Sequence, residues 1–290
     1  MKTPWSSMLN PLSILRPALR TAEAPHVRDP ASVARQMWLT TMALLPCLLA
    51  RMYGEGWRMV AIVAVSYATM AALEAGNALL RRRAIDESIL VAGSLLALLL
   101  PYSTPLWMVA LGAAVAVLQG KILLNDVGRN RLNGPLVAWV LLALLWPDVI
   151  QAKDSRPDEL LLLLAALLGG GFLLAAGVTN WRMAATCLFW AMVLSGLLHW
   201  QRGGSTPLWH ELGGGLLLGT LFIASDRLTS PITAGGKWIC GTIVGISVVL
   251  LRETLTFSEG AMLALLLGNL LAPLLDSAVF VWRLKRLPAG

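Results

Sequence analysis

Long apolar runs alternate with short polar connections along most of this chain. Ten such runs are predicted to be helices, at residues 33–51, 57–79, 87–101, 105–124, 134–150, 158–178, 182–200, 208–224, 237–252 and 259–282. About 20 apolar residues in a helix span the hydrocarbon core of a bilayer. We therefore expect an all-α integral membrane protein of about ten transmembrane helices, in which the short third and eighth segments cross incompletely.

Composition supports a membrane protein and excludes several soluble classes. Apolar residues make up 57% of the 290 residues and charged residues 13%, whereas soluble domains carry about 25% charged residues. The mean hydropathy is +0.70. The net charge of +7 does not indicate nucleic-acid binding, because the basic residues stand at the ends of apolar segments rather than in one patch. The three cysteines and three histidines show no spacing typical of metal ligands.

The basic residues also predict orientation. In a ten-helix arrangement, 17 of the 23 lysines and arginines fall on the side that holds both termini. The other side has Arg51, Arg58, Lys153, Arg156, Arg202 and Arg252. Cytoplasmic loops are the ones enriched in basic residues. We therefore expect a cytoplasmic segment at 1–32 with no removable signal peptide, a transmembrane domain at 33–282 and a cytoplasmic tail at 283–290, in a bacterial inner membrane.

Two segments of the chain resemble each other. Gly93–Lys121 and Gly214–Glu253 each contain an apolar half-span, a break rich in Pro, Ser and Thr, and a second apolar span. Because the second copy begins five helices after the first, an odd number, the two copies would enter the membrane from opposite sides. This favours two inverted five-helix repeats, 33–150 and 158–282, with broken or re-entrant helices that often mark a binding site. The alternative is an accidental similarity between two common loop compositions.

Two acidic residues lie in or beside apolar segments, where a charge is costly and tends to be functional. Asp226 stands among the hydroxyls of FIASDRLTSPIT, and Asp276 lies inside the last apolar run, three residues after Pro273. Both are candidates for ion-linked or structural acidic sites. The alternative for Asp226 is a hydrogen-bonded loop that anchors a helix break. For Asp276 a functional role is favoured more, because the interior of a helix offers a carboxylate few free hydrogen-bond donors.

The most polar stretch between two strong spans is GKILLNDVGRNRLNGP, at Gly120–Pro135. Its asparagine amides both donate and accept hydrogen bonds, which suits a heterocyclic ring with mixed edges. By itself a loop of this composition is weak evidence for ligand binding.

Five motifs in this order resemble the RnfD/NqrB family, the membrane subunits of flavin-containing, ion-translocating oxidoreductases. They are APHVRDPASVARQMWLTTMALLPCLLARMYGEG at Ala24–Gly56, DESILVAGSLLALLLPYSTPLW at Asp86–Trp107, GKILLNDVGRN at Gly120–Asn130, FIASDRLTSPITAGGKW at Phe222–Trp238 and SEGAMLALLLGNLLAPLLD at Ser258–Asp276. The resemblance is closer to the RnfD branch in the short segment before PHVR, whereas APHVRD and GKW are more like NqrB.

The resemblance implies a flavin site and also a departure from the family. Asn130 and Asn133 align with family positions that contact a non-covalent riboflavin-type flavin, and Lys121 and Gly128 belong to the same motif. The site is altered, since this chain has Asn125-Asp126 and Asn133-Gly134-Pro135 where the family has two glycines and NPA.

The covalent flavin of the family is expected to be absent. Family members have an SGAT threonine, esterified to FMN, in the loop after the fifth helix. Here that loop reads VIQAKDSRPDE, and no threonine occurs between Thr104 and Thr179. Any flavin is therefore expected to be riboflavin or FMN held without the ester bond.

The function implied is that of a subunit, not catalytic alone, of an Rnf-type ferredoxin:NAD oxidoreductase that transports Na+ or H+. Its expected partners are the lipid bilayer and subunits of the RnfA, RnfE, RnfG and RnfC types, with no nucleic acid. Two alternatives stay open, a transporter or channel-like relative that has lost redox work and a purely scaffolding subunit. The sequence reveals no catalytic nucleophile, general base or metal site.

Overall fold

The computed structural model describes residues 30–82, 87–119, 132–150, 159–201, 215–226, 229–255 and 257–284. All regular secondary structure in these ranges is helical, which confirms the expected all-α class. The elements are α2 (Pro30–Glu55), α3 (Trp57–Arg81), α4 (Ser88–Leu99), α5 (Leu106–Leu118), α6 (Gly134–Leu145), α7 (Pro147–Ile150), α8 (Glu159–Ala175), α9 (Trp181–Gln201), α10 (Leu216–Leu218), the π-helix η5 (Gly219–Ala224), α11 (Ala234–Thr254) and α12 (Phe257–Leu284). The chain divides into residues 1–35, described only for the start of α2, and residues 36–290, which contain everything discussed below.

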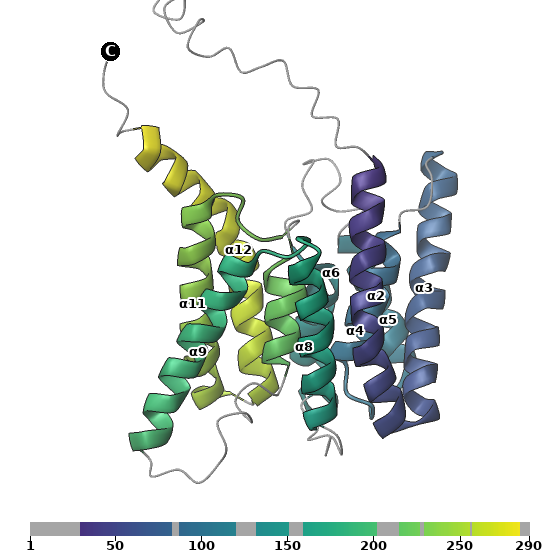
Figure 1. Cartoon of the computed structure of the whole chain (residues 1–290). Helices are drawn as coiled ribbons and strands as arrows, with labels where there is room; N and C mark the ends of the chain where they lie inside the picture. Colours follow the sequence, from purple (N-terminus) through teal and green to yellow (C-terminus); the bar gives the residue numbers. More distant parts are fainter. Residues whose placement is uncertain are drawn as a thin grey trace, which may run out of the picture. The chain divides into compact units, whose positions relative to one another are not determined.

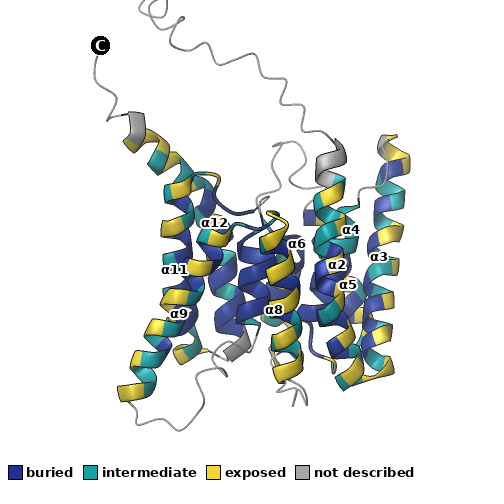
Figure 2. Cartoon of the chain, in the orientation of Figure 1, coloured by how far each residue is buried: buried dark blue, intermediate teal, exposed yellow. Residues whose placement is uncertain are grey.

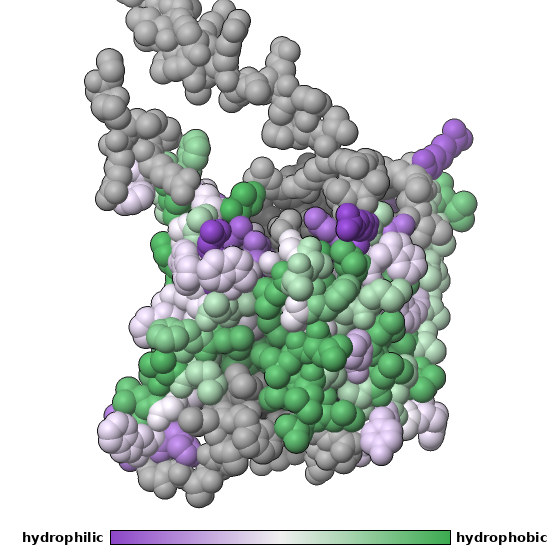
Figure 3. Space-filling view, in the orientation of Figure 1, coloured by the Kyte–Doolittle hydropathy of each residue, from purple (hydrophilic) through white to green (hydrophobic). Residues whose placement is uncertain are grey.

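Among the described residues, four helices have the length and composition to cross a membrane, at Trp57–Leu80, Trp181–Gln201, Ala234–Thr254 and Glu259–Trp282. Shorter apolar helices lie at Ser88–Leu99, Leu106–Leu118, Gly134–Leu145 and Leu160–Ala175. Large apolar side chains also cover the outside of the molecule, and on α8 the exposed ones are Leu160, Leu161, Leu164, Leu167, Leu168 and Phe172. Figure 3 shows such residues as a broad hydrophobic surface below a hydrophilic upper edge. An apolar outer surface of this extent is typical of a protein surrounded by lipid.

Each of the ten predicted segments coincides with helix over most of its described length. The predicted helix 134–150 is divided at Trp146, because Pro147 lacks the N–H that would continue the helix. The third segment is a helix of only 12 residues, α4, and the described part of the eighth is the short stretch Leu216–Ala224. At 1.5 Å per residue, both fall well short of a 30 Å hydrocarbon core. The expected inverted repeats stay a prediction.

The helices pack in two groups. In the first, α3 lies against α4 and α5, while α6 packs on both α4 and α5. In the second, α11 lies between α9 and α12, side by side in Figure 1, and η5 packs on α12, α9 and α8. Figure 2 shows the buried residues in the interior of the helix assembly and the exposed ones on its outer faces. All six residues of η5 are buried, as are seven of the 12 residues of α4 and seven of the 12 residues of α6. Contacts of α12 with α6 connect the two groups.

Glycines bring helix backbones into direct contact. On α11, a Cβ atom at Gly241 would lie 2.8 Å from the carbonyl oxygen of Met183, and one at Gly245 would lie 2.5 Å from that of Cys187. Glycines four residues apart form one strip on a helix, and such strips let membrane helices approach closely. The sequence GTIVG therefore fixes α11 against α9.

Each break between two helical elements receives hydrogen bonds from side chains of neighbouring segments. The first break, residues 100–105, separates α4 from α5, and it receives hydrogen bonds from Arg51 and Arg58. The second break, residues 225–233, separates η5 from α11, and it receives hydrogen bonds from Asn180. Arg51 lies in the last turns of α2, although the sequence suggested an outer loop, and its residue surface is only 3% exposed.

The two breaks lie toward opposite ends of α2. Arg51 contacts the first break, whereas Gln36 lines a cavity together with Asp226 and Thr229 of the second break. Fifteen residues of helix correspond to a separation of about 22 Å along α2. The second break is therefore at the end of the molecule where α2 begins.

The packing of α8 generates a matched pair of substitutions. A Cβ at Gly169 would lie 2.0 Å from the carbonyl oxygen of Ala43 on α2, whereas one at Gly171 would meet nothing within 4 Å. We expect Gly169→Ala to lower the free energy of unfolding by about 1–3 kcal/mol through overpacking. Gly171→Ala should be neutral or stabilising by up to about 1 kcal/mol, because alanine favours helix. Thermal unfolding of both variants in detergent measures this, and equal midpoints would contradict the tight α8–α2 contact.

Candidate functional site

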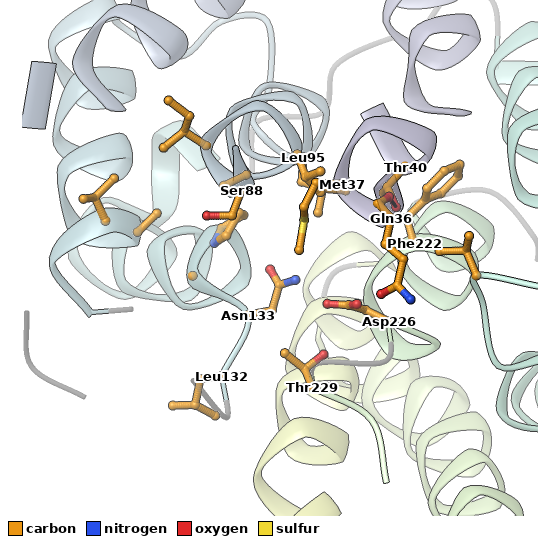
Figure 4. Close-up of a pocket in the computed structure, with 18 residues that line it drawn as sticks. Gln36, Met37, Thr40, Ser88, Leu95, Leu132, Asn133, Phe222, Asp226 and Thr229 are labelled. Atoms are coloured by element: carbon orange, nitrogen blue, oxygen red, sulfur yellow. Dashed lines mark hydrogen bonds between the residues drawn. The ribbon is translucent and has the colours of Figure 1, made fainter. Parts of the chain in front are cut away.

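A cavity of about 120 Å³ lies between α2, α4, the ends of α5 and α6 that face each other, and the second break. Its polar lining residues are Gln36, Thr40, Ser88, Asn133, Asp226 and Thr229. Figure 4 shows Asn133 and Asp226 pointing toward one another across it. The cavity therefore unites two residues that the sequence suggested separately and that are 93 positions apart.

Asn133 begins α6. Its side-chain oxygen accepts a hydrogen bond from the backbone N–H of Leu136 at 3.2 Å, which is the N-cap geometry that asparagine favours. The following Gly134 allows a close approach, because a Cβ there would lie 2.7 Å from the carbonyl oxygen of Ala116 on α5. The cap uses the amide oxygen, and the side-chain nitrogen of the buried Asn133 carries two N–H donors at the lining of the cavity.

Asp226 follows η5 at the start of the second break and is half-buried. Among the described lining residues, Asp226 is the one with an acidic or basic side chain. Its backbone oxygen accepts a hydrogen bond from the N–H of Ser230 at 2.9 Å, which closes the turn of the break. Single-turn π-helices often occur at functional sites, and here η5 directs the chain so that the carboxylate reaches the cavity.

The hydroxyls around Asp226 stabilise the break. Ser225 donates to the carbonyl of Leu221 at 2.7 Å, and Thr229 donates to that of Ile223 at 3.4 Å. The amide of Asn180 donates to the hydroxyl of Ser230 at 2.9 Å, and its backbone N–H donates to the carbonyl of Ser225 at 3.2 Å. These bonds attach the wall of the cavity to the turn between α8 and α9.

Asp276 lies outside the cavity and holds the other end of the break. One carboxylate oxygen accepts from the backbone N–H of Ile232 at 2.8 Å, and the other accepts from the N–H and hydroxyl of Thr233 at 2.9 and 2.6 Å. Thr233 is the N-cap of α11 and accepts from the N–H of Gly236. A carboxylate at this position also meets the positive end of the α11 dipole. The helix interior thus provides Asp276 with partners from the neighbouring break, which the sequence did not suggest.

The other predicted flavin contacts, Lys121, Gly128 and Asn130, lie outside the described residues. The structure adds Gln36, Thr40 and Ser88, which sequence reasoning missed. The sequence did contain a signal for Gln36 and Thr40. Polar residues four positions apart lie on the same face of a helix, and the rest of this predicted helix is mostly apolar.

The contacts of Asp276 predict a stability effect. Asp276→Ala leaves three donors of Ile232 and Thr233 without their acceptor and should cost about 2–3 kcal/mol of unfolding free energy. Ser277→Ala is the matched control, because its exposed hydroxyl bonds only the carbonyl of Pro273 in the same helix. Amide hydrogen exchange at Ile232 and Thr233 should accelerate in the first variant alone. Unchanged exchange there would show that the carboxylate does not hold the break.

The chain is similar to known membrane proteins over nearly its whole length. The sequence profile of the NQR2, RnfD, RnfE family matches residues 20–161 and 159–281. The B-type subunit of the Na(+)-translocating NADH-quinone reductase of Azotobacter vinelandii is 29% identical over 364 aligned positions, covering 94% of this chain and 90% of that protein. The corresponding protein of Stutzerimonas stutzeri is 27% identical with the same coverage.

A relative from the other branch is equally similar. The D-type subunit of the ion-translocating oxidoreductase complex of Methanosarcina acetivorans is 29% identical over 271 positions, covering 87% of this chain and 92% of the relative. Since the family profile covers most of the chain, the resemblance noted in its motifs is confirmed. This multi-pass membrane protein belongs to the NQR2, RnfD, RnfE family.

Proposed function

We propose that this chain is the D-type membrane subunit of an Rnf-type ion-translocating oxidoreductase complex, and that its cavity binds a non-covalent flavin. The complex would transfer electrons between ferredoxin and NAD while it transports Na+ or H+ across the inner membrane. Family membership supports the coarser role of a membrane subunit in an Nqr- or Rnf-type complex. The observation that carries the finer proposal is the cavity that unites Asn133 with Asp226.

Alignment length favours the Rnf branch. The alignment with the quinone reductase protein runs to 364 positions, more than the 290 residues of this chain, so that relative contains segments that are absent here. The alignment with the D-type relative needs only 271 positions. Identity alone does not separate the branches, since both relatives are 29% identical.

The proposed topology has ten crossings with both termini in the cytoplasm. The excess of basic residues at that side supports it. The cavity lies toward the end of α2 that contains Gln36, which in this topology is the cytoplasmic end. The positions of the two breaks, toward opposite ends of α2, support the inverted repeats.

The cavity suits the polar edge of a flavin ring. Asn133 offers N–H donors, Asp226 and Gln36 offer acceptors, and Leu95 and Phe222 offer apolar surface. No lysine or arginine is among the described lining residues, so these walls do not bind a phosphate group. A volume of about 120 Å³ holds part of a ring rather than a whole cofactor. The flavin supplies the redox chemistry, and these residues bind and orient it.

Substitution of the capping asparagine tests flavin binding. Asn133→Asp keeps the N-cap acceptor for Leu136 but removes the N–H donors and adds a second carboxylate opposite Asp226. We expect at least about a tenfold loss of retained flavin, which corresponds to about 1.4 kcal/mol. Extraction and fluorescence of the purified protein measure it. Asn77→Asp on α3, outside the cavity, is the chemically matched control.

The intact mass of the protein tests the absence of a covalent flavin. We expect the mass of the polypeptide alone, with all flavin released on denaturation. A mass increased by one FMN would contradict the proposal. A chain that contains no flavin in either form would be reduced to a scaffolding or transporter-like relative.

Asp226 is proposed to link ion movement to electron transfer. In the assembled complex, Asp226→Asn should slow ion-coupled electron transfer from ferredoxin to NAD at least about tenfold, because the site loses its charge. Glu253→Gln, on an exposed position of α11, serves as the control. Equal rates and equal ion transport in both variants would remove Asp226 from the mechanism.

A further inference from the structure

The buried guanidinium of Arg51 occupies the end of the interrupted helix α4. Its Nη1 donates to three carbonyl oxygens, those of Ala97, Leu98 and Leu100, at 3.1, 2.9 and 3.0 Å. Such carbonyls are left without intrahelical partners where a helix ends. Because Nη1 has two N–H groups, the three carbonyl oxygens share them, and all three lie within 3.1 Å of this positively charged group.

A carboxylate balances this charge. Glu55, one turn after Arg51 on α2, accepts from Nε at 2.9 Å and, through its second oxygen, from Nη2 at 2.8 Å. Both side chains are buried, with 2% and 7% of their surfaces exposed. The guanidinium is therefore enclosed between the carboxylate on one side and the helix carbonyls on the other.

The components are those of a cation site. In membrane proteins, backbone carbonyls at the C-terminal ends of half-helices coordinate cations, and the helix dipole makes that end negative. The first break differs from an ordinary ion site because its cation, the guanidinium of Arg51, is covalently part of the chain.

We propose that the first break is a cation site whose permanent occupant is the guanidinium of Arg51, with Glu55 as its counter-charge. Removal of the side chain leaves a site for a small soluble cation of the guanidinium class. A tethered cation cannot exchange with ions in solution. The first break is thus a fixed element of the membrane domain, and its carbonyls are closed to ions in solution while Arg51 is in place.

Chemical rescue tests the site on the purified chain in detergent. Arg51→Ala should lower the thermal unfolding midpoint, and guanidinium chloride should restore it in a saturable manner, with half-saturation on the order of 1 mM or above. Sodium chloride controls for ionic strength and urea for an uncharged molecule of the same shape. The wild-type midpoint should show no such rise, because its site is filled.

Three further variants separate a specific site from general stabilisation. Arg51→Ala combined with Glu55→Gln should lose the rescue, because the counter-charge is gone. Arg51→Lys keeps a tethered cation and should not respond to guanidinium. Arg58→Ala, whose guanidinium bonds the carbonyls of Tyr102 and Ser103 closer to the surface, should show no saturable rescue.

The proposal is overturned if folded Arg51→Ala does not respond to guanidinium, or responds no more than Arg58→Ala. If Arg51→Ala folds poorly, the yield of folded protein should recover when guanidinium is present during purification, and no recovery counts against the site. These measurements involve neither flavin nor electron transfer. Their outcome is therefore independent of the proposed function.

Discussion

An interrupted helix in a low-dielectric interior leaves backbone carbonyls at one end and N–H groups at the other, and no water is at hand to satisfy them. In this protein each break receives a charged side chain of the sign that its helix end requires. The cation of Arg51 meets the carbonyl end of α4, and the carboxylate of Asp276 meets the N–H end of α11. Both charges come from long continuous helices, α2 and α12. The short elements are therefore positioned by their neighbours rather than by their own hydrogen bonds.

This constraint explains why the cavity forms where it does. The second break is bonded to Asp276 through Ile232 and Thr233, and to Asn180 through Ser225 and Ser230. These bonds hold the described residues of the break, among which Asp226 and Thr229 line the cavity at the start of α6, where Asn133 uses its amide oxygen for the cap. A polar cavity with one carboxylate thus arises between two apolar helix groups, and glycine contacts hold the surrounding helices close to one another.

The two breaks differ in the charged side chains that hold them. The first receives two guanidinium groups, from Arg51 and Arg58, bonded to its carbonyls. At the second, the charged side chains of the described residues are carboxylates, with Asp226 in the break and Asp276 beside it. The carbonyl end of α4 is thus matched by a cation and the start of α11 by a carboxylate, as the helix dipole favours.

The sequence by itself determined the apolar segments, their approximate bounds, the all-α class and the family, because these depend on local composition, helix length and short motifs. It also pointed to Asn133, Asp226 and Asp276, since an amide or carboxylate beside apolar residues is conspicuous. Tertiary structure alone decided that Asn133 and Asp226 share a cavity with Gln36, that Asp276 holds the N-cap residue of α11, and that Arg51 is buried rather than in a loop. Each of these depends on which helices become neighbours. The sequence shows that a carboxylate or a guanidinium is present, but it does not show whether that group will contact water or the end of an interrupted helix.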